Sequence, residues 1–121
     1  MRVMATTAQT ASRRVSPRTQ AREKIPHPET GALDLATIMR VVGDPIRLDM
    51  VRLLADGTPR VCSDIQQVVG LPTSTCSYHL KLLREAGVTR ARAEGTNRLV
   101  TLRFDDLEER FPGLLGVLTA N

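Results

Sequence analysis

Hydrogen-bond donors crowd one predicted helix, which runs from Leu71 to Gly87. The donor side chains on this helix are Thr73, Ser74, Ser77, Tyr78 and Lys81, and none of them carries a negative charge. Hydroxyl and ammonium groups can bond base edges or phosphate oxygens, so this face is suited to bind nucleic acid. Lys81 lies later on the helix than the hydroxyl groups, and we expect it to contact a phosphate. Thr73 or Ser74 could instead be only the N-cap of the helix.

The other face of the same helix is apolar. Its apolar residues recur at spacings of four, three and three and are Cys76, Leu80, Leu83 and Ala86. This spacing predicts one buried stripe. Gly87 predicts the end of the helix, because glycine accepts the left-handed conformation. A shorter helix precedes it, beginning with the capping-box pattern Ser63-Asp64-Ile65-Gln66 and ending at Gly70. Two helices joined by a short turn, the second rich in donors, predict a helix-turn-helix.

A second group of positive charges follows the helix directly. Two short runs, 88–93 and 98–103, flank the turn sequence Glu94-Gly95-Thr96-Asn97, which predicts a β-hairpin. The hairpin carries Arg90, Arg92, Arg98 and Arg103 against the acidic residue Glu94. We expect Arg92 and Arg98 to bind the phosphate backbone of DNA. Taken alone, the same charges would be explained by a solvated sheet edge that resists aggregation.

Catalytic patterns are absent from the sequence. It contains no Ser-His-Asp grouping, no phosphate-binding glycine loop and no His-Glu-x-x-His pattern, so we do not expect an enzyme. Cys76 lies on the apolar stripe and is expected to be a buried thiol. Cys62 lies beside a helix N-terminus, where the helix dipole would lower the pKa of its thiol and make it the more reactive cysteine. His79 is expected to be a neutral surface residue.

The net charge of +4 is unevenly distributed along the 121 residues. The first 30 residues carry the entire excess, whereas residues 31–121 hold equal numbers of acidic and basic side chains. Residues 1–30 are rich in Thr, Ser, Ala, Arg and Pro and predict a disordered basic arm before a folded domain at 31–121. Aromatic residues make up 2%, too few for a platform that stacks single-stranded bases. No apolar run is long enough for a membrane span or a signal core, so we expect a cytoplasmic protein.

Apolar helices are predicted at both ends of the folded domain. The first, from Leu33 to Val42, is apolar on more than one side. Asp44 and Pro45 then start a second helix as its N-cap and first residue. The last helical stretch, 105–118, has an apolar stripe and should kink or restart at Pro112-Gly113. Little remains in the domain for this stripe to cover, so we expect the first and last helices to pair across a homodimer interface.

The order of these elements resembles that of a dimeric bacterial winged-helix repressor, and particular residues narrow the resemblance to the ArsR/SmtB family. Gly43-Asp44-Pro45-Ile46-Arg47-Leu48 resembles that family's (A/G)-D-P-x-R motif, residues 74–88 resemble its recognition helix, and Glu94-Gly95 with Arg98 resembles its wing tip. The resemblance covers residues 33–118. It implies a mainly α fold of about five helices with a two-stranded β wing. It also implies a homodimer that binds a palindromic DNA operator, usually as a repressor. Its base-reading positions match Ser74, Ser77 and Tyr78, and Thr73 matches a neighbouring position.

The metal ligands typical of this family are missing. Its arsenic and cadmium sensors carry Cys-Val-Cys where this sequence has Val61-Cys62-Ser63. Its zinc and nickel sensors use Asp, His and Glu on the last helix, where this sequence has no histidine. No metal site or cofactor is therefore predicted. Two alternatives remain open: a thiol-, redox- or metal-responsive sensor that uses Cys62, and a winged helix that binds a protein partner rather than DNA.

Overall fold

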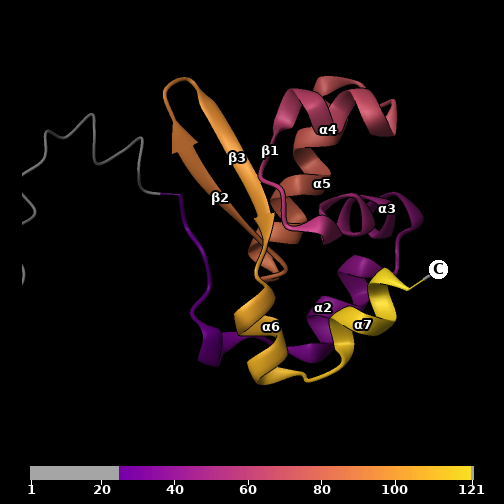
Figure 1. Cartoon of the computed structure of the whole chain (residues 1–121), viewed down its shortest axis with the longest axis vertical. Helices are drawn as coiled ribbons and strands as arrows, with labels where there is room; N and C mark the ends of the chain where they lie inside the picture. Colours follow the sequence, from indigo (N-terminus) through magenta and orange to yellow (C-terminus); the bar gives the residue numbers. More distant parts are fainter. Residues whose placement is uncertain (1–24, 121) are drawn as a thin grey trace, which may run out of the picture.

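Six α-helices and a small antiparallel sheet form the part of the chain that the computed structural model describes, residues 25–120 (Figure 1). The helices are α2 (Leu35–Val42), α3 (Pro45–Leu53), α4 (Cys62–Val69), α5 (Thr73–Glu85), α6 (Phe104–Arg110) and α7 (Leu114–Thr119). The strands are β1 (Arg60–Val61), β2 (Thr89–Glu94) and β3 (Asn97–Leu102), and the short 3₁₀ helices are η1 (Thr30–Ala32) and η2 (Leu54–Asp56). This order confirms the predicted winged helix-turn-helix. Within residues 25–120, none of the helices is long and apolar enough to cross a membrane.

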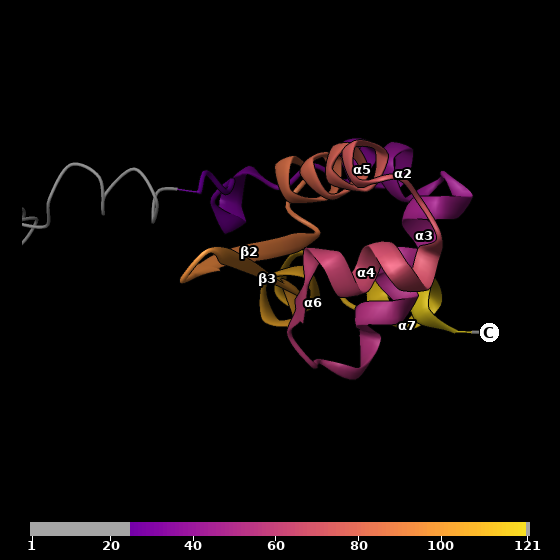
Figure 2. The same cartoon turned by 90° about the horizontal axis from the view of Figure 1, so that it is seen from above.

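The helix-turn-helix consists of α4, a turn at residues 70–72 and α5 (Figure 2). Gly70 ends α4 in the left-handed conformation, with a φ of 72°. Helix α4 begins at Cys62, with Val61 at its N-cap and no side-chain cap. The predicted capping box is therefore wrong, because Ser63 lies inside the first turn rather than before it. Pro72 is the N-cap residue of α5, so neither Thr73 nor Ser74 caps that helix.

The apolar stripe of α5 is buried, as predicted from its spacing. Its members Cys76, Leu80, Leu83 and Ala86 join one core with residues of α2, α3, α4 and the sheet. The start of α3 also follows the prediction, because Asp44 Oδ2 accepts the backbone N–H groups of Ile46 and Arg47 at 3.0 and 3.1 Å. Burial of one stripe of α5 fixes the orientation of the helix. Its donor-rich side therefore faces outward.

The wing is a hairpin of β2 and β3 with a third strand at its edge. The pair Glu94–Asn97 closes the hairpin, and Gly95 in the turn has a φ of 62°. Strand β1 pairs with the other edge of β3, which gives the strand order β1-β3-β2. The prediction of a two-stranded wing thus missed one strand. Two residues are too few to show the alternation by which a strand is detected in a sequence.

Residues 25–33 run along β2 and α6 (Figure 1). His27 Nε2 accepts the backbone N–H of Ala91 at 3.0 Å, and Arg110 donates to three backbone carbonyls of this segment. The prediction of a disordered arm is therefore wrong for residues 25–30. These contacts join positions far apart in the sequence, so the composition of the segment does not show them. The rest of the predicted arm, residues 1–24, lies outside the described residues.

The His27 bond predicts a pH-dependent stability. Burial lowers the pKa of His27, and the positive charges of Arg90, Arg103 and Arg84 lower it further. The unfolded chain therefore binds a proton more readily, so the stabilisation is complete above a pH of 6.5 and declines as the pH falls below it. We expect the free energy of unfolding to decrease by at most about 1.4 kcal/mol per pH unit from this group.

Urea unfolding between about pH 7.5 and 5.5 measures this slope. His27→Gln keeps an acceptor for the Ala91 N–H but cannot titrate, so it should flatten the slope. An equal slope in both proteins would show that His27 is not the titrating group.

The closing helices are two separate elements, as Pro112-Gly113 predicted: α7 begins after Gly113, which has a φ of 89°. Their apolar residues Leu107, Leu115 and Leu118 are buried in the core of the same chain. The expectation that this stripe has little to cover within the domain is therefore wrong. The large apolar side chains that are exposed on α2 and α7 are Leu35, Met39 and Val117, with exposed fractions of 45%, 49% and 72%. Figure 1 shows α2, α6 and α7 together at the end of the molecule opposite the wing tip.

Candidate DNA-binding surface

The predicted donor residues of α5 are all accessible. Thr73, Ser74, Ser77, Tyr78 and Lys81 are exposed, and the Tyr78 side chain extends well into solvent. Thr73 Oγ1 also donates to Gln66 Oε1 at 3.1 Å, which links the start of α5 to α4. Lys81 Nζ lies 3.9 Å from Glu85 Oε2, and both side chains are largely exposed. Such an exposed pair is weak, so Lys81 can exchange this partner for a phosphate.

The donor face of α5 adjoins the wing. Ser77 and Lys81 of α5 line one cavity of about 260 Å³ together with Arg98 of β3. Thr73 and Ser77 also share a neighbouring hollow with Arg98. The structure therefore brings four of the predicted site residues together at the junction of α5 and β3. Tyr78 lies apart from this junction, beside residues of α2 and α3.

A part-buried contact between Arg47 and His79 adjoins the exposed Tyr78 ring. Arg47 Nε donates to the carbonyl of Val41 at 2.6 Å, and Arg47 Nη1 lies 3.0 Å from Nδ1 of His79. An arginine N–H can only donate, so Nδ1 of His79 is the acceptor in this contact. The His79 ring contacts the Tyr78 ring edge-on, with centroids 5.5 Å apart. His79 is buried, so the expectation of a surface position is wrong.

Sequence reasoning did not assign a role to Arg47. In the structure, Arg47 joins α3 to α5 through its contact with His79. The sequence did contain a feature that pointed to Arg47, because this residue is the arginine of the Gly43–Leu48 segment that resembles the family motif. Its contact with His79 spans 32 positions, which no local pattern reveals.

The wing arginines divide into two groups. Arg92 and Arg98 are exposed, and Arg92 Nη1 lies 3.6 Å from Glu94 at the surface. Arg90 and Arg103 instead bond the carboxylate of Asp106 at 3.0 and 2.9 Å. Asp106 therefore binds two of the four wing arginines, and these two are not the ones expected to bind phosphates.

Asp106 anchors the base of the wing. Its carboxylate accepts bonds from Arg103, from Arg90 and from the Thr30 hydroxyl, and the bonds from Arg103 and Thr30 lower the pKa of Asp106 most. Arg103 is 3% exposed, so it serves the fold rather than DNA. Asp106, in the first turn of α6, therefore binds side chains of η1, β2 and the end of the wing.

Both cysteines are free thiols, and both line the hollow between α4 and α5. Burial raises the pKa of the Cys62 thiol, although the nearby positive charges of Arg98 and Arg84 act in the opposite direction. The expectation that the helix dipole lowers the pKa of Cys62 is therefore wrong. Cys76 is buried, as predicted, and its pKa is also raised by burial. Within residues 25–120, no group of three or more His, Cys, Asp or Glu side chains could hold a metal ion.

Comparison with known proteins agrees with this geometry. The model of the Helix-turn-helix domain family matches residues 42–92. The HTH-type transcriptional regulator YceK of Bacillus subtilis is 34% identical over 84 residues, which are 69% of this chain and 84% of that protein. The cadmium resistance transcriptional regulatory protein CadC homolog of Staphylococcus aureus is 32% identical over 75 residues, 61% of this chain and 60% of that protein.

A solved structure extends the agreement to three dimensions. The homodimeric winged helix-turn-helix DNA-binding domain of a possible ArsR-family regulator from Mycobacterium bovis matches with a TM-score of 0.59 and 27% identity. The match covers 69% of this chain and 76% of that one. The chain belongs to the ArsR family of winged helix-turn-helix transcriptional regulators. This ArsR-family regulator therefore has a DNA-binding fold, and its family consists of transcriptional regulators rather than enzymes.

Proposed function

We propose that the protein is a repressor that binds an imperfect palindromic operator as a homodimer in the cytoplasm. The observation that carries this proposal is the junction of the exposed donor face of α5 with Arg98 of the wing. A recognition helix in the major groove and a wing on the flanking backbone would use both parts of this surface. With one recognition helix per subunit, the half-sites should lie about 10 base pairs apart or a multiple of that distance.

The contact residues divide by chemistry. Ser74, Ser77 and Tyr78 carry hydroxyl groups at the outer face of α5, and we assign them to the base edges. Thr73, Lys81, Arg92 and Arg98 are assigned to phosphate oxygens. Arg92 and Arg98 are exposed and do not bond Asp106, whereas the exposed Arg90 and the buried Arg103 both do.

We assign the homodimer interface to α2 and α7. Leu35 and Met39 are one helical turn apart on α2, and both are about half exposed. Val117 on α7 is 72% exposed. Helices α2 and α7 both pack on α3, so all three residues lie on one rigid part of the chain. Apolar side chains gathered at one end of a small domain are typical of an interface.

Substitutions should separate base reading from phosphate binding. Ser77→Ala and Tyr78→Ala are expected to cost about 1–3 kcal/mol at particular base pairs and to relax sequence preference. Arg92→Ala and Arg98→Ala should weaken binding to all sequences and reduce the salt slope by about one each. Fluorescence anisotropy with an operator, its point variants and sheared genomic DNA at two salt concentrations measures both effects.

Arg52→Gln is the matched control, because it removes a positive charge on α3 beside Val68 and Asp49, away from the wing. Arg52 Nε donates to the carbonyl of Leu118 on α7 at 3.0 Å, and glutamine keeps an N–H donor for this carbonyl. A serine variant that weakened every sequence equally would contradict the base-reading assignment. A winged helix that binds only proteins would not bind sheared DNA at either salt concentration. A footprint over one unrepeated half-site would contradict the dimer.

A further inference from the structure

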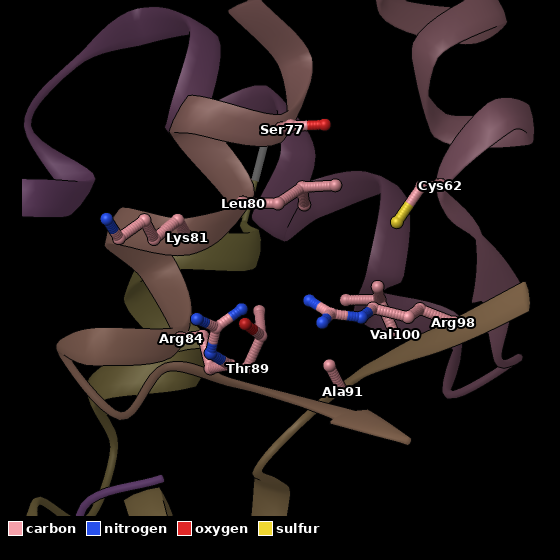
Figure 3. Close-up of a pocket in the computed structure, with 9 residues that line it drawn as sticks. All are labelled: Cys62, Ser77, Leu80, Lys81, Arg84, Thr89, Ala91, Arg98 and Val100. Atoms are coloured by element: carbon pink, nitrogen blue, oxygen red, sulfur yellow. The ribbon is translucent and has the colours of Figure 1, made fainter. Parts of the chain in front are cut away.

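Two guanidinium groups converge on the cavity between α4, α5 and the wing (Figure 3). Arg84 reaches it from α5 and Arg98 from β3, and Figure 3 shows their guanidinium groups directed into the space between them. Ser77 and Cys62 line the cavity above them in this view, and the Thr89 hydroxyl lies beside Arg84. Lys81 lies at the edge of the cavity, with its ammonium group directed away from both arginines.

The positive charge of this cavity has no counter-charge among the described residues. The side chains that line it include no carboxylate. Within residues 25–120, neither Arg84 nor Arg98 forms a salt bridge, and the buried Nε of Arg84 has no hydrogen-bond acceptor. Leaving a buried charged donor without an acceptor costs more than leaving a neutral one. Two like charges around one cavity add repulsion.

Each of the other buried or half-buried arginines within residues 25–120 has at least one hydrogen-bond partner. Arg103 bonds Asp106 and the carbonyl of Pro28, and Arg110 bonds three carbonyls. Arg47 bonds the carbonyl of Val41 and His79. Arg60 leaves one nitrogen unpaired but is joined to Asp56 by another. Arg84 differs from these residues in facing an open cavity.

The thiol in the cavity does not supply the missing negative charge. Cys62 lines the same cavity as Arg84 and Arg98, and the positive charges of both guanidinium groups favour its thiolate. The effect of burial on the pKa is larger than the effect of the two arginines. The pKa of Cys62 is therefore raised, and the group is a neutral thiol.

We propose that this cavity is a phosphate-binding site, in which Arg84 and Arg98 hold one phosphate group from two sides. Guanidinium groups match phosphate oxygens in geometry and charge. The hydroxyl groups of Ser77 and Thr89 add donors at its wall. The phosphate comes either from the DNA backbone or from a small phosphate-bearing compound. The first source rests on the proposed function, because Ser77 and Arg98 also belong to the proposed DNA-binding surface.

The site itself is tested on the full chain without DNA. Isothermal titration calorimetry with inorganic phosphate, at constant ionic strength against chloride, should show saturable binding in the millimolar range. Arg84→Met and Arg98→Met should each raise the dissociation constant about tenfold. Arg52→Gln should leave it unchanged. Thermal unfolding of each variant shows whether it is folded, and Arg98, which is exposed, gives a valid test if Arg84→Met does not fold.

The absence of saturable binding to the wild-type chain would overturn the proposal, as would equal binding by the folded arginine variants. Competition with DNA then identifies the source. If phosphate displaces DNA more than chloride does at equal ionic strength, and Arg84→Met removes this difference, the site takes a backbone phosphate. If phosphate binds without displacing DNA, the site takes a small compound. A chain that binds phosphate but no DNA would refute the proposed function and leave the phosphate site standing.

Discussion

Met39→Asp is expected to convert the proposed homodimer into monomers and to weaken operator binding by about 10²- to 10⁴-fold. A dimer engages the second half-site as an intramolecular event, and a monomer loses this gain. Met39 is 49% exposed on α2 and adjoins Leu35 on the same face. A carboxylate placed in an apolar interface must lose its hydration without a partner, which opposes association. Sedimentation velocity measures the association state, and fluorescence anisotropy measures the affinity for the full palindrome.

Val68→Asp is the matched control for association. Val68 is 64% exposed on α4, so it is an apolar surface residue away from α2 and α7. This variant should remain a dimer. Monomeric Met39→Asp should also keep its preference for the sequence of one half-site, because α5 is unchanged. A Met39→Asp protein that sediments as a dimer, with unchanged operator affinity, would place the interface elsewhere.

The sequence predicted the recognition helix well because the helix is long and its two faces differ in chemistry. The stripe from Cys76 to Ala86 is buried and the donor side is exposed, as the spacing of apolar residues requires. The hairpin could be predicted equally well from the sequence, since its turn contains Gly95 between two short runs of strand-forming residues. The assignments of Ser74, Ser77 and Tyr78 to bases stay predictions, because exposure alone does not distinguish a base from a phosphate.

The sequence could not predict which charged side chains are bound to other side chains of the same domain. Arg90, Arg98 and Arg103 look alike in the sequence, but Asp106 takes the first and last of them. Asp106 is 16 positions from Arg90, and the contact depends on how α6 returns to the wing. The same limit applies to the contact between Arg47 and His79. Side chains that meet across distant elements become visible only when the elements are placed.

Gly87→Ala is expected to destabilise the protein by about 2–5 kcal/mol, through strain in the backbone and through crowding. Gly87 has a φ of 86° and follows the last residues of α5. Its N–H donates to the carbonyl of Arg84, and the N–H of Val88 donates to the carbonyl of Leu83. These two bonds form a Schellman motif, which requires the left-handed conformation at this position. A Cβ atom here would also overlap the Leu33 side chain and approach Pro28 Cγ to 3.3 Å.

Gly70→Ala separates the two causes. Gly70 also has a left-handed backbone, with a φ of 72°, but a Cβ atom there would meet nothing within 4 Å. This variant should therefore show only the backbone cost, about 1–2 kcal/mol. Urea unfolding followed by circular dichroism gives both values, and their difference is the cost of crowding against Leu33. Displacing Leu33 would also loosen the segment that holds His27, so Gly87→Ala should speed hydrogen exchange of the Ala91 amide while Gly70→Ala should not. Equal destabilisation by the two alanines would mean that the 25–33 segment can move aside without loss, and that its packing contributes little to stability.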